Sequence, residues 1–213
     1  MTASLRVRVT VYLLLGGLVP WAGVKTVWTL GGDALGVDGE AWRRGIESDG
    51  DAVYRALAAV GVDLTVLAAL LGVFLALGLV QRWGMVFPRW TPLLAGWRVP
   101  APLPLIPAWA VGLCLGTYGV VLLVMVPLGL AGVIARFPPV PPFTSSGDVT
   151  WMILFGGLAF GGLGAALVVG ACSYGRRGAR LRTRRSPRAG RRDVLSRRRD
   201  APWRGRRSRP SPR

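Results

Sequence analysis

The sequence predicts an all-α, polytopic membrane protein with four transmembrane helices and a basic C-terminal tail. Three observations lead to this fold class. Hydrophobic residues make up 52% of the 213 residues, four long stretches carry at most one charge each, and most of the net positive charge lies at one end of the chain. A bilayer core about 30 Å thick requires a helix of about 20 apolar residues. A soluble chain of this length would lack the polar surface to cover four such helices.

Each apolar stretch is long enough to cross the bilayer once. We expect spans at about residues 9–30, 57–80, 105–134 and 150–173, after a short leader of residues 1–8. Lys25 interrupts the first span and Asp63 the second, whereas the other two carry no charge. Pro127 is expected to kink the third span, because proline removes a backbone donor. The first span has a rival interpretation as a cleaved signal peptide, since a basic start precedes an apolar stretch.

The distribution of arginine in the short loops predicts the orientation. Arg6 and Arg8 precede the first span, and the loop between the second and third spans carries three arginines and no acid. The loop after the first span instead contains six acidic residues against three arginines, and we expect a short helix at residues 40–46 within it. Because basic loops stay in the cytoplasm, both termini should be cytoplasmic in a bacterial inner membrane.

Residues 176–213 form a polycationic tail. They contain 17 arginines and two aspartates, whereas the preceding 175 residues are nearly neutral. With so few apolar residues the tail cannot bury a core, so we expect it to be disordered and to lie on anionic lipid headgroups. Binding of nucleic acid or of a protein partner is the alternative. A single aromatic residue, Trp203, offers little base stacking, so nucleic acid is the less favoured partner.

The composition excludes several kinds of chemistry. The chain has no histidine, which removes imidazole catalysis and histidine-ligated metal sites. Cys114 and Cys172 are far apart in apolar stretches, so they do not form a redox or metal-binding pair. The acids Glu47, Asp49 and Asp51 match only the first part of a calcium loop. We therefore predict a non-enzymatic protein with no catalytic residue, no metal and no cofactor.

Lys25 and Asp63 are the two charges inside the expected spans. A charge at the bilayer centre costs about 2.5–3.5 kcal/mol, so such residues are functional candidates. Both should lie near the outer ends of consecutive antiparallel helices, and hence at similar depth. We expect an interfacial ion pair between them that fixes the rotation of this helical hairpin. The alternatives are two separately solvated boundary residues, or an ion relay that would need further intramembrane acids.

The loop between the second and third spans combines tryptophan, arginine and proline. Its prolines exclude one continuous helix. Indole rings favour the headgroup level and guanidinium groups favour phosphates. We expect an interfacial strap anchored by Trp83, Arg89, Trp90, Trp97 and Arg98.

Small residues recur every fourth position in the last two spans. The pairs are Gly112 with Gly116, and Gly157 with Gly161. Such spacing lets helix backbones approach closely. We expect these glycines to pack within the chain, and self-association is the alternative.

Several short motifs flank the first two spans: KTVWTLGG at residues 25–32, WG at 83–84, PRW at 88–90 and GWRVP at 96–100. On these motifs the chain resembles an uncharacterised family of multi-span integral membrane proteins of GC-rich, actinobacterial-type bacteria. The resemblance covers about residues 10–135 and implies a membrane location, but no reaction or ligand. The arginine tail is not part of it.

These expectations combine into a non-catalytic structural or interaction component of the membrane. Its partners would be the lipid bilayer, anionic headgroups through the tail, and a second copy or another membrane protein. The alternative is a subunit of a small oligomeric transporter or channel. A pore would then require several copies, because helices rich in Gly and Leu offer hardly any polar lining.

Overall fold

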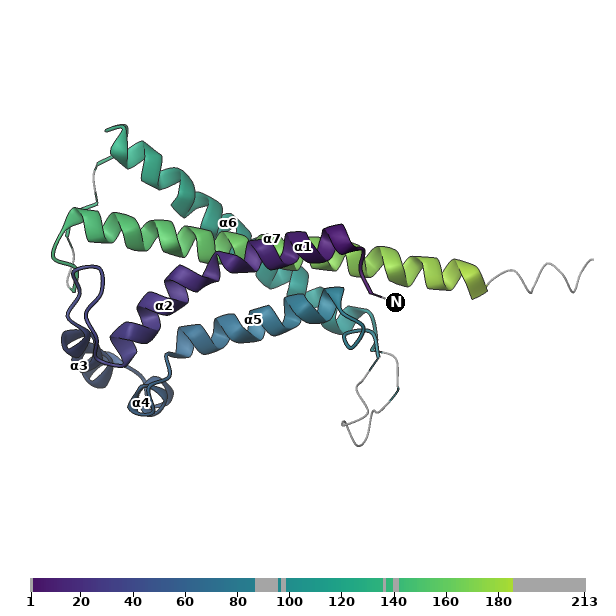
Figure 1. Cartoon of the computed structure of the whole chain (residues 1–213), viewed down its shortest axis with the longest axis horizontal. Coiled ribbons are helices and arrows are strands. Elements are labelled where there is room, and N and C mark those ends of the chain that lie inside the picture. Colours follow the sequence, from purple (N-terminus) through teal and green to yellow (C-terminus); the bar gives the residue numbers. More distant parts are fainter. Residues whose placement is uncertain (1, 87–95, 97–98, 136, 140–141, 186–213) are drawn as a thin grey trace, which may run out of the picture. The chain divides into compact units, whose positions relative to one another are not determined.

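The computed structural model describes residues 2–86, 96, 99–135, 137–139 and 142–185. This part of the chain contains α-helices and no β-strand, so the all-α prediction is confirmed (Figure 1). The chain divides into a unit of residues 1–176 and a second unit of residues 177–213. The helices are α1 (Leu5–Gly16), α2 (Leu18–Thr29), α3 (Gly39–Asp49), α4 (Ala52–Ala59), α5 (Leu64–Val80), α6 (Pro102–Leu130) and α7 (Ser146–Arg185).

Three helical segments are long and apolar enough to cross a membrane. They are Leu5–Thr29, which comprises α1 and α2, Pro102–Leu130 in α6, and Ser146–Ala179 in α7. A fourth is added if α4 and α5 count as one broken span. The described part therefore has the helix lengths and apolar character of an integral membrane protein.

The first expected span is a helix with a break at Gly17, between α1 and α2. Pro20 lacks the N–H that would bond the carbonyl of Gly16, and two consecutive glycines have low helix propensity. The helix also begins earlier than expected. Residues 5–8 of the predicted leader, with Arg6 and Arg8, already belong to α1.

The expected span at residues 57–80 is not one straight helix. Residues 57–59 end α4, residues 60–63 form a break, and α5 then starts at an angle of 88° to α4. Gly61 takes a φ of +75°, and Asp63 caps the N-terminus of α5. Glycine tolerates this left-handed backbone, and an aspartate at the N-cap satisfies free backbone donors. The remaining helix has 17 residues and is about 26 Å long.

The ends of α6 and α7 also differ from the expected boundaries. Helix α6 stops at Leu130 instead of residue 134, because Gly132 adopts a φ of +74° and Val133 N–H bonds back to the Leu128 carbonyl at 2.9 Å. Helix α7 starts after Ser145, whose Oγ accepts from Asp148 N–H at 3.1 Å.

The first part of the tail is helical, which corrects the prediction of disorder from residue 176. Helix α7 continues to Arg185. Arg, Ala and Leu are good helix formers, and the next proline along the sequence is Pro187. The prediction for residues 186–213 lies outside the described residues.

The loop between α2 and α3 folds over the start of α7. Ala34 and Val37 pair across a tight turn in which Leu35 and Gly36 both have positive φ. The Gly36 carbonyl accepts a hydrogen bond from Thr144 Oγ1 at 3.2 Å. This loop thereby links the ends of α2 and α3 to the segment that leads into α7.

Glycines at the contacts with α7 bring neighbouring helices against its backbone. A Cβ placed at Gly119 on α6 would overlap the backbone nitrogen of Gly161, and one at Gly164 would overlap that of Gly116. On another face, a Cβ at Gly17 would lie 2.6 Å from the carbonyl oxygen of Leu158. Real Cβ atoms do not approach backbone so closely, so these glycines set the helix separations.

The buried core surrounds α7. Its α7 members are small or aliphatic residues and one tyrosine, and residues from α1, α2, α5 and α6 complete it. The α7 members are Ala159, Leu163, Ala166, Leu167, Ala171 and Tyr174.

The glycine contacts predict different costs for neighbouring substitutions on α6. Gly119→Ala should lower the stability in detergent by about 1–3 kcal/mol, because overpacking forces the helices apart. Gly116→Ala is the matched control, since its Cβ would find its nearest neighbour only at 3.9 Å. The thermal midpoint of each purified variant measures the difference. Equal midpoints for the two variants would contradict the described packing.

Candidate functional site

Asp63 is almost fully buried, with 3% of its surface exposed, and its carboxylate is held by four donors. The backbone N–H groups of Thr65 and Val66 donate to Oδ1 at 2.7 and 3.2 Å, and the Thr65 hydroxyl donates to the same atom. Tyr54 on α4 donates its hydroxyl to Oδ2 at 3.0 Å. Asp63 therefore caps α5 and ties α4 to it across the bend.

Lys25 lies against tryptophan rings. Its Nζ is 4.1 Å from the centroid of the Trp42 ring and 5.7 Å from that of Trp28. The two rings pack together at 4.9 Å, and Trp28 Nε1 donates to the Ala34 carbonyl at 2.9 Å. An ammonium over an aromatic face is stabilised by about 0.5–2 kcal/mol, depending on how far it is desolvated. These contacts connect α2 to α3 and to the loop between them.

The expected direct ion pair between Lys25 and Asp63 is not formed. Arg43 and Glu47 on α3 form an ion pair at 4.0 Å, but Lys25 and Asp63 do not come within that distance of each other. Asp63 acts on Lys25 only through space. The physical reason is that each charge has a nearer partner: the free N–H groups of α5 attract the carboxylate, and the indole faces attract the ammonium.

A cavity of about 740 Å³ lies beside Lys25, between α2, α5, α6 and α7. Its polar lining residues are Lys25, on α2, and Thr65, on the first turn of α5. The remainder of the lining is apolar and continues along α5 to Leu75 and along α7 to Leu163. The arrangement combines one cation with a long apolar wall.

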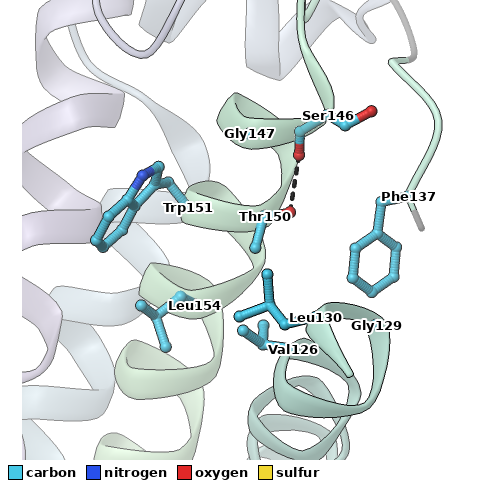
Figure 2. Close-up of a pocket in the computed structure, with 9 residues that line it drawn as sticks. All are labelled: Val126, Gly129, Leu130, Phe137, Ser146, Gly147, Thr150, Trp151 and Leu154. Carbon is cyan, nitrogen blue, oxygen red and sulfur yellow. Dashed lines mark hydrogen bonds between the residues drawn. The ribbon is translucent and has the colours of Figure 1, made fainter. Parts of the chain in front are cut away.

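A second pocket, of about 430 Å³, lies between the end of α6 and the start of α7 (Figure 2). Val126 and Leu130 face Leu154 across it, and Phe137 closes one side (Figure 2). Thr150 Oγ1 is already used within the chain, since it donates to the Ser146 carbonyl at 2.7 Å. With no charged residue in its lining, this pocket points to no particular ligand.

Of the expected strap residues, the structure describes Trp83. Its ring packs on Phe74 with centroids 4.6 Å apart and lies over Gly78, so it is half-buried against α5. Val99 N–H donates to the Met85 carbonyl at 3.1 Å, which brings the two ends of the loop together. Arg89, Trp90, Trp97 and Arg98 lie outside the described residues.

The expected packing glycines all lie where α6 meets α7. Gly112 lies close to Leu167, and Gly157 lies close to Leu123. The backbone of Gly116 contacts Gly164, and the backbone of Gly161 contacts Gly119. The four-residue spacing located the right faces but missed Gly119 and Gly164, which have the least room.

No group of three or more His, Cys, Asp or Glu side chains that could hold a metal ion occurs among the residues that the structure describes. Asp51, from the calcium-like run of acids, accepts from Tyr54 N–H at 2.8 Å and caps α4. Sequence reasoning also missed the roles of Trp42 and Tyr54. A signal for the break was present in Gly61 followed by Asp63, since glycine and then aspartate is typical of one helix ending and another starting.

Comparison with known proteins adds no assignment: no family model, curated protein or solved structure matches this chain. The resemblance to multi-span proteins of GC-rich bacteria stays a prediction.

Removing the Asp63 carboxylate should destabilise the fold more than removing an ordinary cap. Asp63→Ala should cost about 2–3 kcal/mol, because it removes a helix cap and leaves a half-buried phenol without its acceptor. Asp38→Ala is the matched control, since Asp38 caps α3 through exposed bonds to Glu40 and Ala41. Thermal midpoints in detergent compare the two. A larger loss for Asp38→Ala would refute the role assigned to Asp63.

Tyr54 should make the protein sensitive to alkali. It lies on α4, outside the three long apolar helices, and burial raises its pKa from 10.0 to about 12, with further contributions from the charge of Asp63 and their hydrogen bond. The folded state thus favours the neutral phenol. This stabilisation is complete below pH 10 and disappears as the pH rises through 12.

Thermal midpoints measured between pH 9 and 12 test this expectation. The midpoint of the unmodified protein should fall more steeply above pH 10 than that of Tyr54→Phe, which has no proton to lose. Parallel curves for the two proteins would show that Tyr54 does not titrate in this way.

Proposed function

We propose that this protein is a non-catalytic, four-pass component of the bacterial inner membrane whose basic C-terminal segment contacts anionic lipid. The observation that carries the proposal is the apolar surface of its long helices. Leu13, Leu71 and Ile106 are 74%, 66% and 68% exposed on α1, α5 and α6. Soluble monomers rarely expose large contiguous apolar patches. A bilayer is the solvent that suits this surface.

In this proposal α1 with α2, α5, α6 and α7 each cross once. Helix α5 is about 26 Å long, close to the hydrocarbon thickness of about 30 Å. Helix α4, at 88° to α5, would then lie along the membrane surface. Helix α4 is amphipathic, as a surface helix should be. The capping residues of α4 and α5, Asp51 and Asp63, lie on either side of it.

The distribution of charge supports both termini on the cytoplasmic side. Ala3 N–H donates to the Val80 carbonyl at 3.0 Å, so the start of α1 and the end of α5 share one end of the bundle. Arg6, Arg8 and Arg82 belong to that end. The acidic helix α3 packs through Trp42 on the last turn of α2, at the other end (Figure 1). Positive charge marks the cytoplasmic side of membrane proteins.

The described surface supports a structural or interaction role better than a pore. A pore formed by several copies requires a polar face on at least one helix. The exposed side chains of α6 include Ile106, Val120 and Val124, which suit lipid or another apolar helix. The carboxylate of Asp63, at the N-terminus of α5, accepts hydrogen bonds from four donors, so it is not poised to carry ions or protons.

Trypsin accessibility tests the orientation and the tail together. Residues 186–213 carry 11 arginines, so they offer many cleavage sites. Trypsin should remove a C-terminal epitope tag in inverted inner-membrane vesicles and leave it intact in spheroplasts. Removal of the tag in spheroplasts would overturn the proposed topology.

The lipid contact is tested with the purified full chain in nanodiscs. Cleavage of the tail should be slower in discs containing phosphatidylglycerol than in discs of phosphatidylcholine, and 0.5 M NaCl should abolish the difference by screening. A tag placed in the acidic loop between α2 and α3 is the control, since its cleavage should not depend on the lipid charge in this way. Equal tail cleavage in both lipids would remove the proposed lipid contact.

A further inference from the structure

We propose that the cavity beside Lys25 binds one acyl chain of an anionic phospholipid from the surrounding bilayer, with the headgroup on the Lys25 ammonium. This inference rests on the membrane location proposed above, and it concerns the leaflet on the Lys25 side. It therefore adds a second lipid contact, separate from that of the C-terminal segment.

The dimensions of the cavity suit one chain in one leaflet. Its volume of about 740 Å³ lies within the range of roughly 300–1,000 Å³ that is usual for ligand sites. Its lining on α5 runs from Thr65 to Leu75, which corresponds to about 15 Å at the helical rise. That depth is about half of a hydrocarbon core of roughly 30 Å. A chain anchored at the Lys25 end would reach the middle of the bilayer.

The cavity is polar at one end and apolar elsewhere, as an amphiphile requires. Ala68 and Gly72 on α5 leave space opposite Leu115 on α6 and Phe160 on α7. A Cβ added at Gly72 would lie only 2.9 Å from the side chain of Leu163. Helices α5 and α7 are therefore in direct contact at this part of the cavity wall. Apolar lining with a few placed polar groups is typical of ligand sites.

The charge at the polar end favours an anion. Lys25 Nζ contacts indole rings, and no carboxylate lies within 4.0 Å of it in the described part of the chain. Asp63 attracts Lys25 through space, but its own oxygens already accept from Thr65, Val66 and Tyr54. An ammonium presents three donors, so it has capacity for phosphate oxygens. A headgroup with net negative charge should bind better than a zwitterionic one.

The cavity is accessible from the side on which lipid would lie. Thr65, Ala68 and Leu71 line it and are exposed, and the neighbouring Leu70 is 58% exposed. A bilayer phospholipid could therefore insert one chain between the helices and leave its second chain among its neighbours. This route favours a phospholipid already in the membrane over an amphiphile that must first leave water.

Native mass spectrometry of the purified full chain tests the proposal. Phosphatidylglycerol and phosphatidylcholine with the same chains are titrated into the detergent-solubilised protein. We expect one phosphatidylglycerol to bind about fivefold more tightly than phosphatidylcholine, from one basic residue at a membrane surface. Lys25→Gln should remove this preference. Arg43→Gln, which changes an exposed cation on α3, is the matched control and should keep it.

A second variant tests the cavity itself. Ala68→Phe places a large side chain in the space and should weaken the binding of both lipids at least tenfold, while its thermal midpoint shows whether it still folds. If that variant unfolds, Ala69→Leu in the same wall replaces it. Unchanged binding by a folded cavity variant would overturn the proposal.

Other outcomes would also overturn it. Equal affinity for the two lipids, or a preference that survives Lys25→Gln, would exclude the assigned headgroup contact. Displacement of phosphatidylglycerol by equimolar palmitate would identify a free fatty acid as the occupant instead. Flotation with vesicles in a density gradient separates this failure from failure of the proposed function. A chain that floats without a bound lipid disproves the site alone, and a chain that does not float disproves the membrane location.

Discussion

The close approach of α1, α2 and α6 to the backbone of α7 is the constraint on which the described bundle depends. In lipid, apolar side chains gain little by leaving one apolar environment for another, so helices associate through close van der Waals contact. Contacts of this kind require surfaces without side chains. Gly119, Gly164 and Gly17 provide them at three points along the bundle. Helix α5 joins the same core where Leu79 lies against Gly170.

The cavity is the counterpart of that tight packing. Helices α6 and α7 are close because glycine faces glycine. On α5, by contrast, the small residues Ala68, Ala69 and Gly72 line the cavity and leave space in front of α6 and α7. A void lined by apolar atoms loses dispersion contacts, so an occupant that restores them is stabilised. A lipid chain is the apolar material available to a membrane helix bundle.

Two charges near one end of the bundle are stabilised by separate means. Asp63 binds the free N–H groups of α5 and the hydroxyl of Tyr54, and Lys25 lies on Trp42. Each set of contacts also positions a helix. The hydrogen bonds of Asp63 hold α4 against α5, and the contact of Lys25 with Trp42 holds α3 against α2. The two charges thus help to fix the arrangement of α2, α3, α4 and α5 at this end of the bundle.

Composition and local sequence alone determined the all-α class, the apolar helices and the concentration of arginine at the C-terminus, because these follow from rules that apply within one segment. The break before α5 was also encoded locally, in Gly61 and Asp63, although hydropathy averaged over residues 57–80 concealed it. Partners between segments are a different matter. Whether Lys25 meets Asp63 or Trp42, and whether Gly116 or Gly119 has the least room, depends on the rotation and axial position of helices distant in sequence. Only the tertiary structure decided these, because a shift of one residue turns a helix by about 100° and presents a different face.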